Sequence, residues 1–312
     1  MKMKDILGCV GWGALILLSS AWIPFFGPFL SLLAPLPFLY YASKLGIYQG
    51  LKLAAVATIT IGLFARLIGS PQIIIFCIEF SLLGLALSEL FKRKLSLGQT
   101  IFFGTAFMLL LGLGFLFFLA LSKGMGPFEM TFNYLETQLK ATLKIYEEIG
   151  MSQENAGELG VYGKAFVAII LKIYPSLMIV GIGFAVWLNV VVAKPLFRMG
   201  RLGYPAFAPT DHWHAPDSLV WGVIVAGFAL FLQSEGIELL AINALIILMV
   251  IYLFHGLSIV LFFLNKYHVP SWLRIGVYIL IIVQQLFFIA LSLAGLFDQW
   301  VDFRKIHRRM ES

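Results

Sequence analysis

Residues 237–264 read IELLAINALIILMVIYLFHGLSIVLFFL, and residues 272–297 read WLRIGVYILIIVQQLFFIALSLAGLF. Each run can cross a membrane as a helix, because about 20 apolar residues span the roughly 30 Å of hydrocarbon in a bilayer. Strongly polar side chains interrupt both runs, namely Asn243, His255, Gln284 and Gln285. The two runs therefore predict a pair of membrane-spanning helices that hold polar groups within them.

The composition of the whole chain points the same way. Of its 312 residues, 61% are hydrophobic and 12% are charged, and the mean hydropathy is +0.94. A soluble domain carries about 25% charged residues, so most of this surface faces lipid. Spanning segments are either helices or closed barrels, and the uninterrupted apolar runs exclude the alternating pattern of a barrel. We predict an all-α, polytopic transmembrane bundle of roughly eight or nine spans.

The other spans are predicted at about residues 1–22, 29–43, 47–68, 72–90, 100–121, 162–193 and 218–232. The first also fits a cleavable signal peptide. We expect it to be retained, because the apolar run continues through Trp22 and further spans follow at once. Prolines and glycines at 24–37 predict a short, irregular second segment. The sixth span is too long for one upright crossing and must tilt, kink at Pro175 or protrude.

Residues 123–163 differ from the rest of the chain. Apolar residues recur at helical spacing from Phe128 to Ile149, with charged residues between them. Pro127 suits the first turn of a helix and Gly150 its end. We predict an amphipathic helix on the non-cytoplasmic face, because acidic residues are in excess there. It would separate an N-terminal five-helix half (1–122) from a C-terminal half (164–312).

Basic residues set the predicted orientation, because cytoplasmic loops are rich in Lys and Arg. Lys2 and Lys4, the cluster 92–94 and the loop 194–201 place the N-terminus in the cytoplasm. The tail carries Arg304, Lys305, Arg308 and Arg309. It lies outside after nine crossings, or inside if residues 218–232 re-enter instead of crossing. Its basic character favours the cytoplasmic side.

Arg66 and Glu79 flank a tight turn at residues 69–71. By helical rise, Glu79 lies about 7 Å deeper than the level opposite Arg66, within reach of the long guanidinium side chain. An ionisable pair at membrane depth is a candidate functional site. The alternatives are a structural ion pair and an Arg66 that extends to the interface.

His255, Gln284 and Gln285 form a second candidate group. Counted from the turn near Tyr267, His255 lies within about one helical turn of Gln284 in depth. A neutral imidazole between two amides could relay a proton or bind a polar ligand. The alternative is an interhelical hydrogen bond, typically worth about 0.6 kcal/mol in a membrane. Asn189 and Asn243 have the same two interpretations.

His212 and His214, with Asp211 and Asp217 nearby, suggest a weak metal hypothesis. Alternate residues of an extended loop face one way, so two imidazoles could converge. A stable zinc site needs three or four ligands. The proline-rich loop around Trp213 is more typical of an anchor at the membrane edge. We predict no metal and no cofactor.

Motifs for enzymes and for nucleic-acid binding are lacking in the sequence. It has no glycine-rich phosphate loop, nucleophile elbow, His-Glu-x-x-His motif or paired cysteines. Cys9 and Cys77 are predicted to pack as small hydrophobes. The net charge of +6 is dispersed among short loops, so it does not indicate nucleic acid. We do not expect an enzyme.

Several stretches resemble the YybS-like family of bacterial membrane proteins, which is defined as a domain of unknown function. They are Pro216–Trp221, then Asn243, Tyr252 and His255–Leu257, and finally Gly295–Arg304, in which Asp298, Trp300, Asp302 and Arg304 carry the likeness. The resemblance covers most of the chain. It implies a protein of the bacterial inner membrane.

A second likeness covers about residues 7–89. A span, a proline-containing loop, a short helix ending in Lys44-Leu45-Gly46 and a glycine-rich third span are similar to the substrate-binding S-components of vitamin importers and to the rod-shape protein MreD. This likeness implies a ligand beneath the loop at 24–28, on the outer side.

These observations favour a transporter-like protein that binds or moves a small molecule or a lipid. The alternatives are a scaffold that recruits membrane-protein partners through its amphipathic segment and tails, and an intramembrane enzyme. A transporter should hold a closed polar cavity near mid-membrane, lined by some of Arg66, Glu79, His255 and Gln284. A scaffold should have these residues paired and packed, and an enzyme should bring titratable groups to one pocket.

Overall fold

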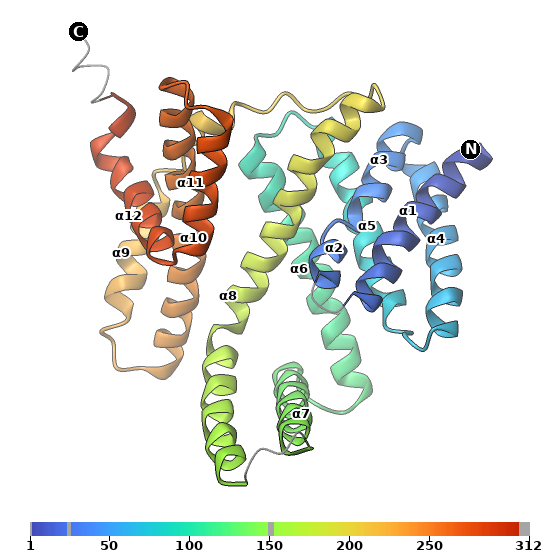
Figure 1. Cartoon of the computed structure of the whole chain (residues 1–312), viewed down its shortest axis with the longest axis horizontal. Coiled ribbons are helices and arrows are strands. Elements are labelled where there is room, and N and C mark those ends of the chain that lie inside the picture. Colours follow the sequence, from blue (N-terminus) through green and yellow to red (C-terminus); the bar gives the residue numbers. More distant parts are fainter. Residues whose placement is uncertain (1, 24–25, 149–152, 306–312) are drawn as a thin grey trace. The chain divides into compact units, whose positions relative to one another are not determined.

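The computed structural model describes residues 2–23, 26–148 and 153–305, and within these ranges its regular structure is entirely helical, without strands (Figure 1). The predicted all-α class is therefore confirmed. In chain order the helices are α1 (Met3–Trp22), α2 (Gly27–Ser31), α3 (Pro35–Leu45), α4 (Ile47–Leu67), α5 (Ile73–Lys92), α6 (Leu97–Ser122), α7 (Pro127–Glu148), α8 (Gln153–Met199), the 3₁₀ turn η1 (Thr210–His212), α9 (Leu219–Ala229), α10 (Glu235–Lys266), α11 (Ser271–Val283) and α12 (Leu286–Val301).

Length and composition identify fewer spans than the predicted eight or nine. In the described ranges, six helices are long and apolar enough to cross a membrane, or up to seven if α11 and α12 count as one bent span. The apolar helices Phe29–Leu45 and Leu219–Ala229 are shorter. Both were predicted as spans, and together with the six or seven long ones they would give eight or nine. Each is shorter than the about 20 helical residues that a full crossing takes.

Two of the predicted boundaries differ from the structure. The predicted single helix at 272–297 is wrong, because α11 and α12 meet at a bend of 102°. The long sixth span is one helix of 47 residues, about 70 Å at 1.5 Å per residue, so it extends well beyond the predicted range 162–193.

A helix, α7, occupies the stretch predicted to be amphipathic. The side chains of residues 128, 138–140 and 142–160 lie outside the described part of the chain. They include most of the residues on which the prediction depends, and Ile149 and Gly150 lie there entirely. The amphipathic surface therefore stays a prediction.

Contacts divide the chain into two compact units, and the first comprises Met1–Thr131 and Gly181–Phe207. One apolar cluster in this unit joins α1, α3, α4 and α5 and buries both Cys9 and Cys77. A second joins α3, α5 and α6 to Val186, Val190 and Phe197 of α8. Helices α3 and α5 touch backbone to backbone, because a Cβ at Gly84 would lie 2.6 Å from the Pro35 carbonyl oxygen.

The second unit comprises Phe132–Val180 and Ala208–Ser312. In it α9 runs antiparallel to α10: the start of α9 packs against Tyr252, and Gly222 lies next to Leu248. Helix α9 thus covers only the N-terminal part of α10. The segment 208–217, largely without regular structure, covers the remainder, with contacts at Ser258 and Asn265.

Helices α10 and α12 cross at two glycines. A Cβ at Gly256 would lie 2.1 Å from the Leu291 carbonyl oxygen, and one at Gly295 would lie 2.1 Å from the Tyr252 carbonyl oxygen. No larger residue fits either position without moving the helices apart. This close crossing positions the polar side chains next to the two glycines.

Candidate functional site

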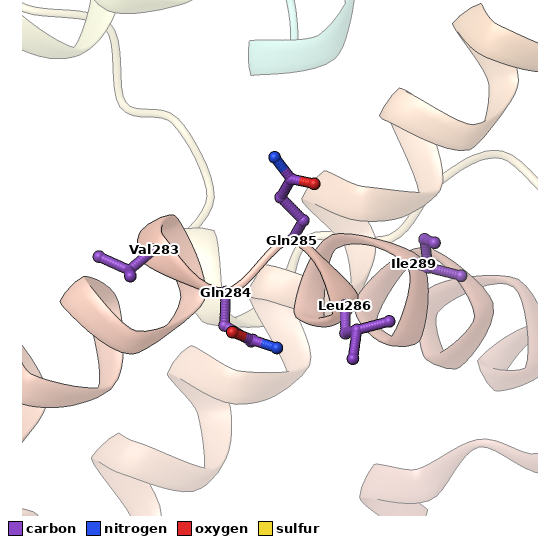
Figure 2. A pocket seen from close by; sticks show the side chains of 5 residues that line it. All are labelled: Val283, Gln284, Gln285, Leu286 and Ile289. Carbon is purple, nitrogen blue, oxygen red and sulfur yellow. The ribbon is translucent and has the colours of Figure 1, made fainter.

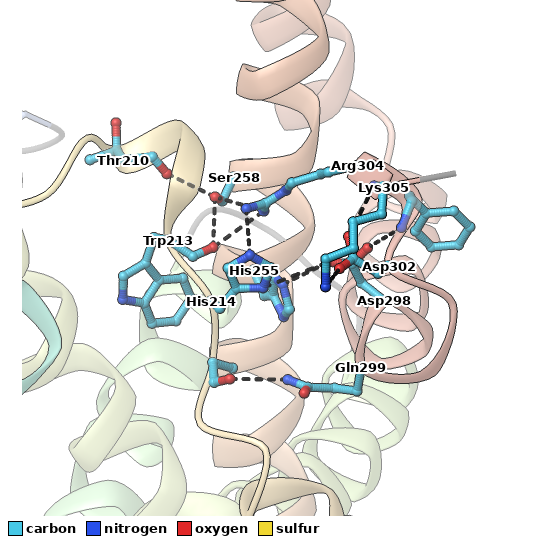
Figure 3. A network of polar contacts seen from close by, with 12 residues as sticks. Thr210, Trp213, His214, His255, Ser258, Asp298, Gln299, Asp302, Arg304 and Lys305 are labelled. Atoms are coloured by element: carbon cyan, nitrogen blue, oxygen red, sulfur yellow. Dashed lines mark hydrogen bonds and ion pairs between the residues drawn. The ribbon is translucent and has the colours of Figure 1, made fainter. Parts of the chain in front are cut away.

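His255 of α10 and Asp298 of α12 form a buried pair beside the glycine crossing (Figure 3). His255 Nε2 lies 3.1 Å from Asp298 Oδ2, and neither side chain has exposed surface. Both residues are neighbours of the crossing glycines in sequence, His255 next to Gly256 and Asp298 one turn after Gly295. The crossing therefore brings the imidazole and the carboxylate together.

Asp298 also determines how the chain leaves α12. Its Oδ1 accepts a hydrogen bond of 2.8 Å from the Phe303 backbone N–H. Asp302 adopts the left-handed conformation, with φ of 46°, which Asp tolerates better than most residues. The chain turns back there and brings Arg304 to the same cluster.

Arg304 is buried, with 4% of its surface exposed. Its guanidinium lies 2.9 Å from His214 Nε2 and donates to the Trp213 carbonyl at 3.2 Å and to Ser258 Oγ at 3.1 Å. The guanidinium also lies 5.8 Å from the centre of the Phe262 ring. Figure 3 shows these groups converging on α10 from the loop and from the segment after α12.

Side chains in and next to this cluster also form hydrogen bonds with backbone carbonyl groups of the segment 208–217. Ser258 Oγ lies within hydrogen-bond distance of the Thr210 and Trp213 carbonyls, at 2.8 and 2.9 Å, and Gln299 Nε2 donates to the Ala215 carbonyl at 3.0 Å. Side chains from α10, α12 and the tail thus bind carbonyl groups of this segment, which is largely without regular structure.

The hydrogen-bond partners indicate the tautomer of each imidazole in its neutral form. An Arg side chain can only donate, so His214 Nε2 accepts and the proton of a neutral His214 lies on Nδ1. That nitrogen is 3.8 Å from Asp298 Oδ2. His255 donates from Nε2 to the same oxygen, which leaves its Nδ1 buried without a partner in the described structure.

These assignments argue against a metal ion, although nitrogen and oxygen atoms of His214, His255 and Asp298 lie within 4.8 Å of one another. A ligating histidine usually donates its other N–H to an acceptor. The other nitrogen of His214 faces a donor, Arg304, and that of His255 has no acceptor. His212 does not join the cluster; its ring lies 5.7 Å from the ring of Phe262. The residues present do not fit a metal centre.

Burial and nearby charges shift the pKa of His214 and of Arg304, which lie outside the spanning helices. Partial burial and the charge of Arg304 lower the pKa of His214, with Asp298 and Asp302 opposing. Burial lowers the pKa of Arg304, and Asp298, Asp302 and Asp211 oppose it. The cluster thus favours a neutral His214 next to a charged guanidinium.

Asn243 of α10 contacts the turn of α8 that contains Pro175. Pro175 has no backbone N–H and disturbs the helical hydrogen bonds of the preceding turn. Ser176 N donates to Asn243 Oδ1 at 2.8 Å, and Asn243 Nδ2 donates to the Lys172 carbonyl at 2.7 Å. In an unbroken helix Ser176 and Lys172 would bond to each other. The carboxamide therefore binds both groups of this helical pair next to the proline.

Gln284 and Gln285 lie at the break between α11 and α12, where with Val283, Leu286 and Ile289 they line an open pocket of about 320 Å³ (Figure 2). Both amides are exposed, and Figure 2 shows them pointing away from each other. The predicted proximity of His255 to these glutamines is not seen, because the polar partner of His255 is Asp298.

The remaining candidates lie apart from the cluster. Arg66 is exposed and Glu79 half-buried, and the described contacts include no ion pair between them. Asn189 is buried in the first unit and donates to the Leu32 and Ala185 carbonyls at 2.6 and 2.7 Å. Trp300 is 61% exposed. Of the tail, Arg308 and Arg309 lie outside the described residues.

Ser258, Gln299 and the carbonyls of the segment 208–217 were not singled out from the sequence. A signal for the cluster was present, however. A glycine adjoins His255, and another precedes Asp298 by three residues. Small residues mark close helix crossings, so polar residues beside them are candidates for contact.

Comparison with known proteins gives the family. The family model described as "Predicted membrane protein (DUF2232)" matches residues 13–299. The chain is 26% identical over 301 residues to the "Uncharacterized protein YybS" of Bacillus subtilis (strain 168), with 93% of each chain covered. No solved structure matches significantly. The resemblance to the YybS-like family is thus confirmed, and this multi-pass membrane protein belongs to the DUF2232 family.

Proposed function

We propose that this protein is transporter-like and binds, and moves, a small polar molecule or a lipid across the bacterial plasma membrane. The observation that carries the proposal is the break between α11 and α12, where two glutamines separate two largely apolar helices. Discontinuous helices with polar groups at the break are a recurring way to build a substrate site in membrane transporters.

The backbone at the break supports this role. Gln284 N donates to the Leu280 carbonyl, and Phe287 N donates to the Gln284 carbonyl. The N–H groups of Gln285 and Leu286 have no backbone partner among the described residues. An unsatisfied amide costs several kcal/mol in hydrocarbon. Water or a polar ligand at the break would remove that cost.

The contacts at the two ends of the pair favour a re-entrant arrangement. Near the start of α11, Arg274 donates to Asn265, and Asn265 donates to Asp211. After α12, Arg304 contacts His214. Both ends are thus tied to the segment 208–217, so α11 and α12 enter and leave on one side. We infer eight crossings, with the re-entrant segment at α11–α12 rather than at residues 218–232.

The charge distribution supports an orientation for these crossings. Basic residues follow α3, α5 and α8, and acidic residues precede α10. With the N-terminus in the cytoplasm, eight crossings place each of these basic groups inside. The tail then lies inside too, in agreement with its basic character.

Cysteine reactivity tests the proposed site. Gln284→Cys and Gln285→Cys, in a chain whose buried Cys9 and Cys77 are replaced by alanine, are treated in opened membrane fragments, where both faces are accessible, with a charged thiol reagent that does not enter lipid. We expect at least one to react about tenfold or more faster than Ile279→Cys and Leu293→Cys. Ile279 and Leu293 are exposed apolar positions on α11 and α12, and lipid would shield them. Equal, slow reaction of all four cysteines would contradict a polar site at the break.

A second candidate function is a scaffold for other membrane proteins. The observation that favours it is that Asn189, Asn243 and His255 are buried and hydrogen-bonded within the chain. A scaffold predicts a stoichiometric protein partner that co-purifies from cross-linked membranes and is lost when residues 127–148 are deleted. Its absence, or retention without that helix, would contradict the scaffold.

A further inference from the structure

In the described structure, every group that accepts a hydrogen bond from the Arg304 guanidinium is neutral. Its hydrogen-bond partners in the described structure are His214 Nε2, the Trp213 carbonyl and Ser258 Oγ. Its Nε has no partner there. A buried cation held by neutral groups depends strongly on each of them, because an unpaired charge is costly away from water. The loss of one acceptor is therefore sufficient to weaken its binding.

His214 is the one acceptor among these three that can change its charge between pH 5 and 8. It accepts from Arg304 only while it is neutral. A second proton would bind at Nε2, so that an imidazolium N–H would face a guanidinium N–H across 2.9 Å. Half of the His214 side chain is exposed, and protons can therefore reach it without unfolding of the cluster.

We propose that His214 and Arg304 form an acid-sensitive latch, which holds the segment after α12 on the loop 208–217 at neutral pH and releases it when His214 is protonated. The latch goes beyond the proposed transport role and does not depend on it. Its released part carries Arg304 and Lys305, and the sequence continues with Arg308 and Arg309. Acid would thus free a basic segment.

The groups around His214 set the direction of the effect. Arg304 and Asp302 face it from the segment after α12, Asp298 from α12 and His255 from α10. Asp302 is already paired with Lys305 at 2.7 Å, and Asp298 accepts from His255 and the Phe303 N–H. Both carboxylates offset part of the new repulsion, but burial, Arg304 and His255 outweigh them, so the pKa of His214 is lowered overall.

The sign of the pH dependence follows from linkage. The pKa of His214 is lowered in the closed state, whereas in the released state it returns toward about 6.5. Protons therefore bind more tightly to the released state. The closed state keeps its full stability above about pH 6.5 and loses it as the pH falls below that value.

Hydrogen exchange measures the latch directly. The full-length protein is purified in detergent micelles, and exchange of a peptide covering residues 298–306 is followed by mass spectrometry from pH 8 to pH 5, corrected for the intrinsic pH dependence of exchange. This peptide contains the Phe303 amide bonded to Asp298. We expect protection to fall with acidification, by up to about tenfold per unit of pKa difference between the two states.

Three variants separate the latch from general acid unfolding. His214→Gln keeps a neutral acceptor and Arg304→Gln removes the cation, so both should show no acid-dependent loss of protection in this peptide, whatever its level at pH 8. His212→Gln changes the neighbouring exposed histidine outside the cluster and should behave as the wild type. A wild-type profile that is flat, or an equal slope in His214→Gln, would overturn the proposal.

Discussion

At the scale of single residues, the cluster depends most on Asp298. Its carboxylate accepts from His255 and from the Phe303 backbone, and its side chain has no exposed surface. Removing one partner of a buried, charged network leaves the others unsatisfied, which is costlier than the interaction itself is worth.

We therefore expect Asp298→Ala to lower the free energy of unfolding by about 3–5 kcal/mol. Asp298→Asn keeps one acceptor oxygen and should cost less, about 1–3 kcal/mol. The matched control is Asp302→Asn, since Asp302 pairs with the exposed Lys305, and such pairs contribute within about 1 kcal/mol. Thermal unfolding of the three variants in detergent gives the ranking. Equal stability of Asp298→Ala and Asp302→Asn would contradict it.

Individual residues also show what the sequence could and could not reveal. His255 and Asn243 were identified as polar groups inside apolar helices, because that property is local to each helix. Their partners were not identified. Asp298 lies 43 residues from His255, and Pro175 lies 68 residues from Asn243. Only the contacts between helices bring each pair together.

At the scale of the elements, the crossing of α10 and α12 should tolerate no side chain at its glycines. Gly295→Ala would place a Cβ 2.1 Å from the Tyr252 carbonyl oxygen and push the helices apart. We expect a loss of about 1–3 kcal/mol or more in thermal unfolding. Gly276→Ala on α11 is the control, because its Cβ would meet no atom within 4 Å. It should be neutral or slightly stabilising.

The hydrogen bonds of Asn243 to the Pro175 turn of α8 predict an energetic coupling between α8 and α10. Asn243→Leu should destabilise the protein while Pro175 is present, because Ser176 N and the Lys172 carbonyl lose their partners. In Pro175→Ala the helix can close its own bond, so the same change should cost less. A double-mutant cycle by thermal unfolding should give a coupling energy of about 0.5–3 kcal/mol. Additive effects of the two changes would contradict a coupling between Asn243 and the Pro175 turn.

Helical spans were predictable to within a few residues where an apolar run ends at charged residues, as for α4 and α5. The break at Gln284 and Gln285 was not predicted. Two glutamines do not interrupt a helix by intrinsic propensity, so the bend depends on packing that no local pattern encodes.

At the scale of the whole molecule, the proposed re-entrant α11–α12 pair predicts on which side the tail lies. If the pair is re-entrant, a green fluorescent protein fused to the C-terminus should fold in the cytoplasm and fluoresce. Alkaline phosphatase inserted between α9 and α10, at residue 233, should be active because it is exported. A dark C-terminal fusion with an active phosphatase there would instead support nine crossings.

The segment 208–217 also constrains how the protein is made. Its carbonyl groups are satisfied by Ser258, Gln299 and Arg304, which the ribosome adds roughly 50 to 90 residues later. Until then these groups have neither their final partners nor a helix to bond within. We therefore expect this part of the chain to reach its final packing only near the end of translation, and truncation just before Arg304 should yield a product that quality-control proteases degrade.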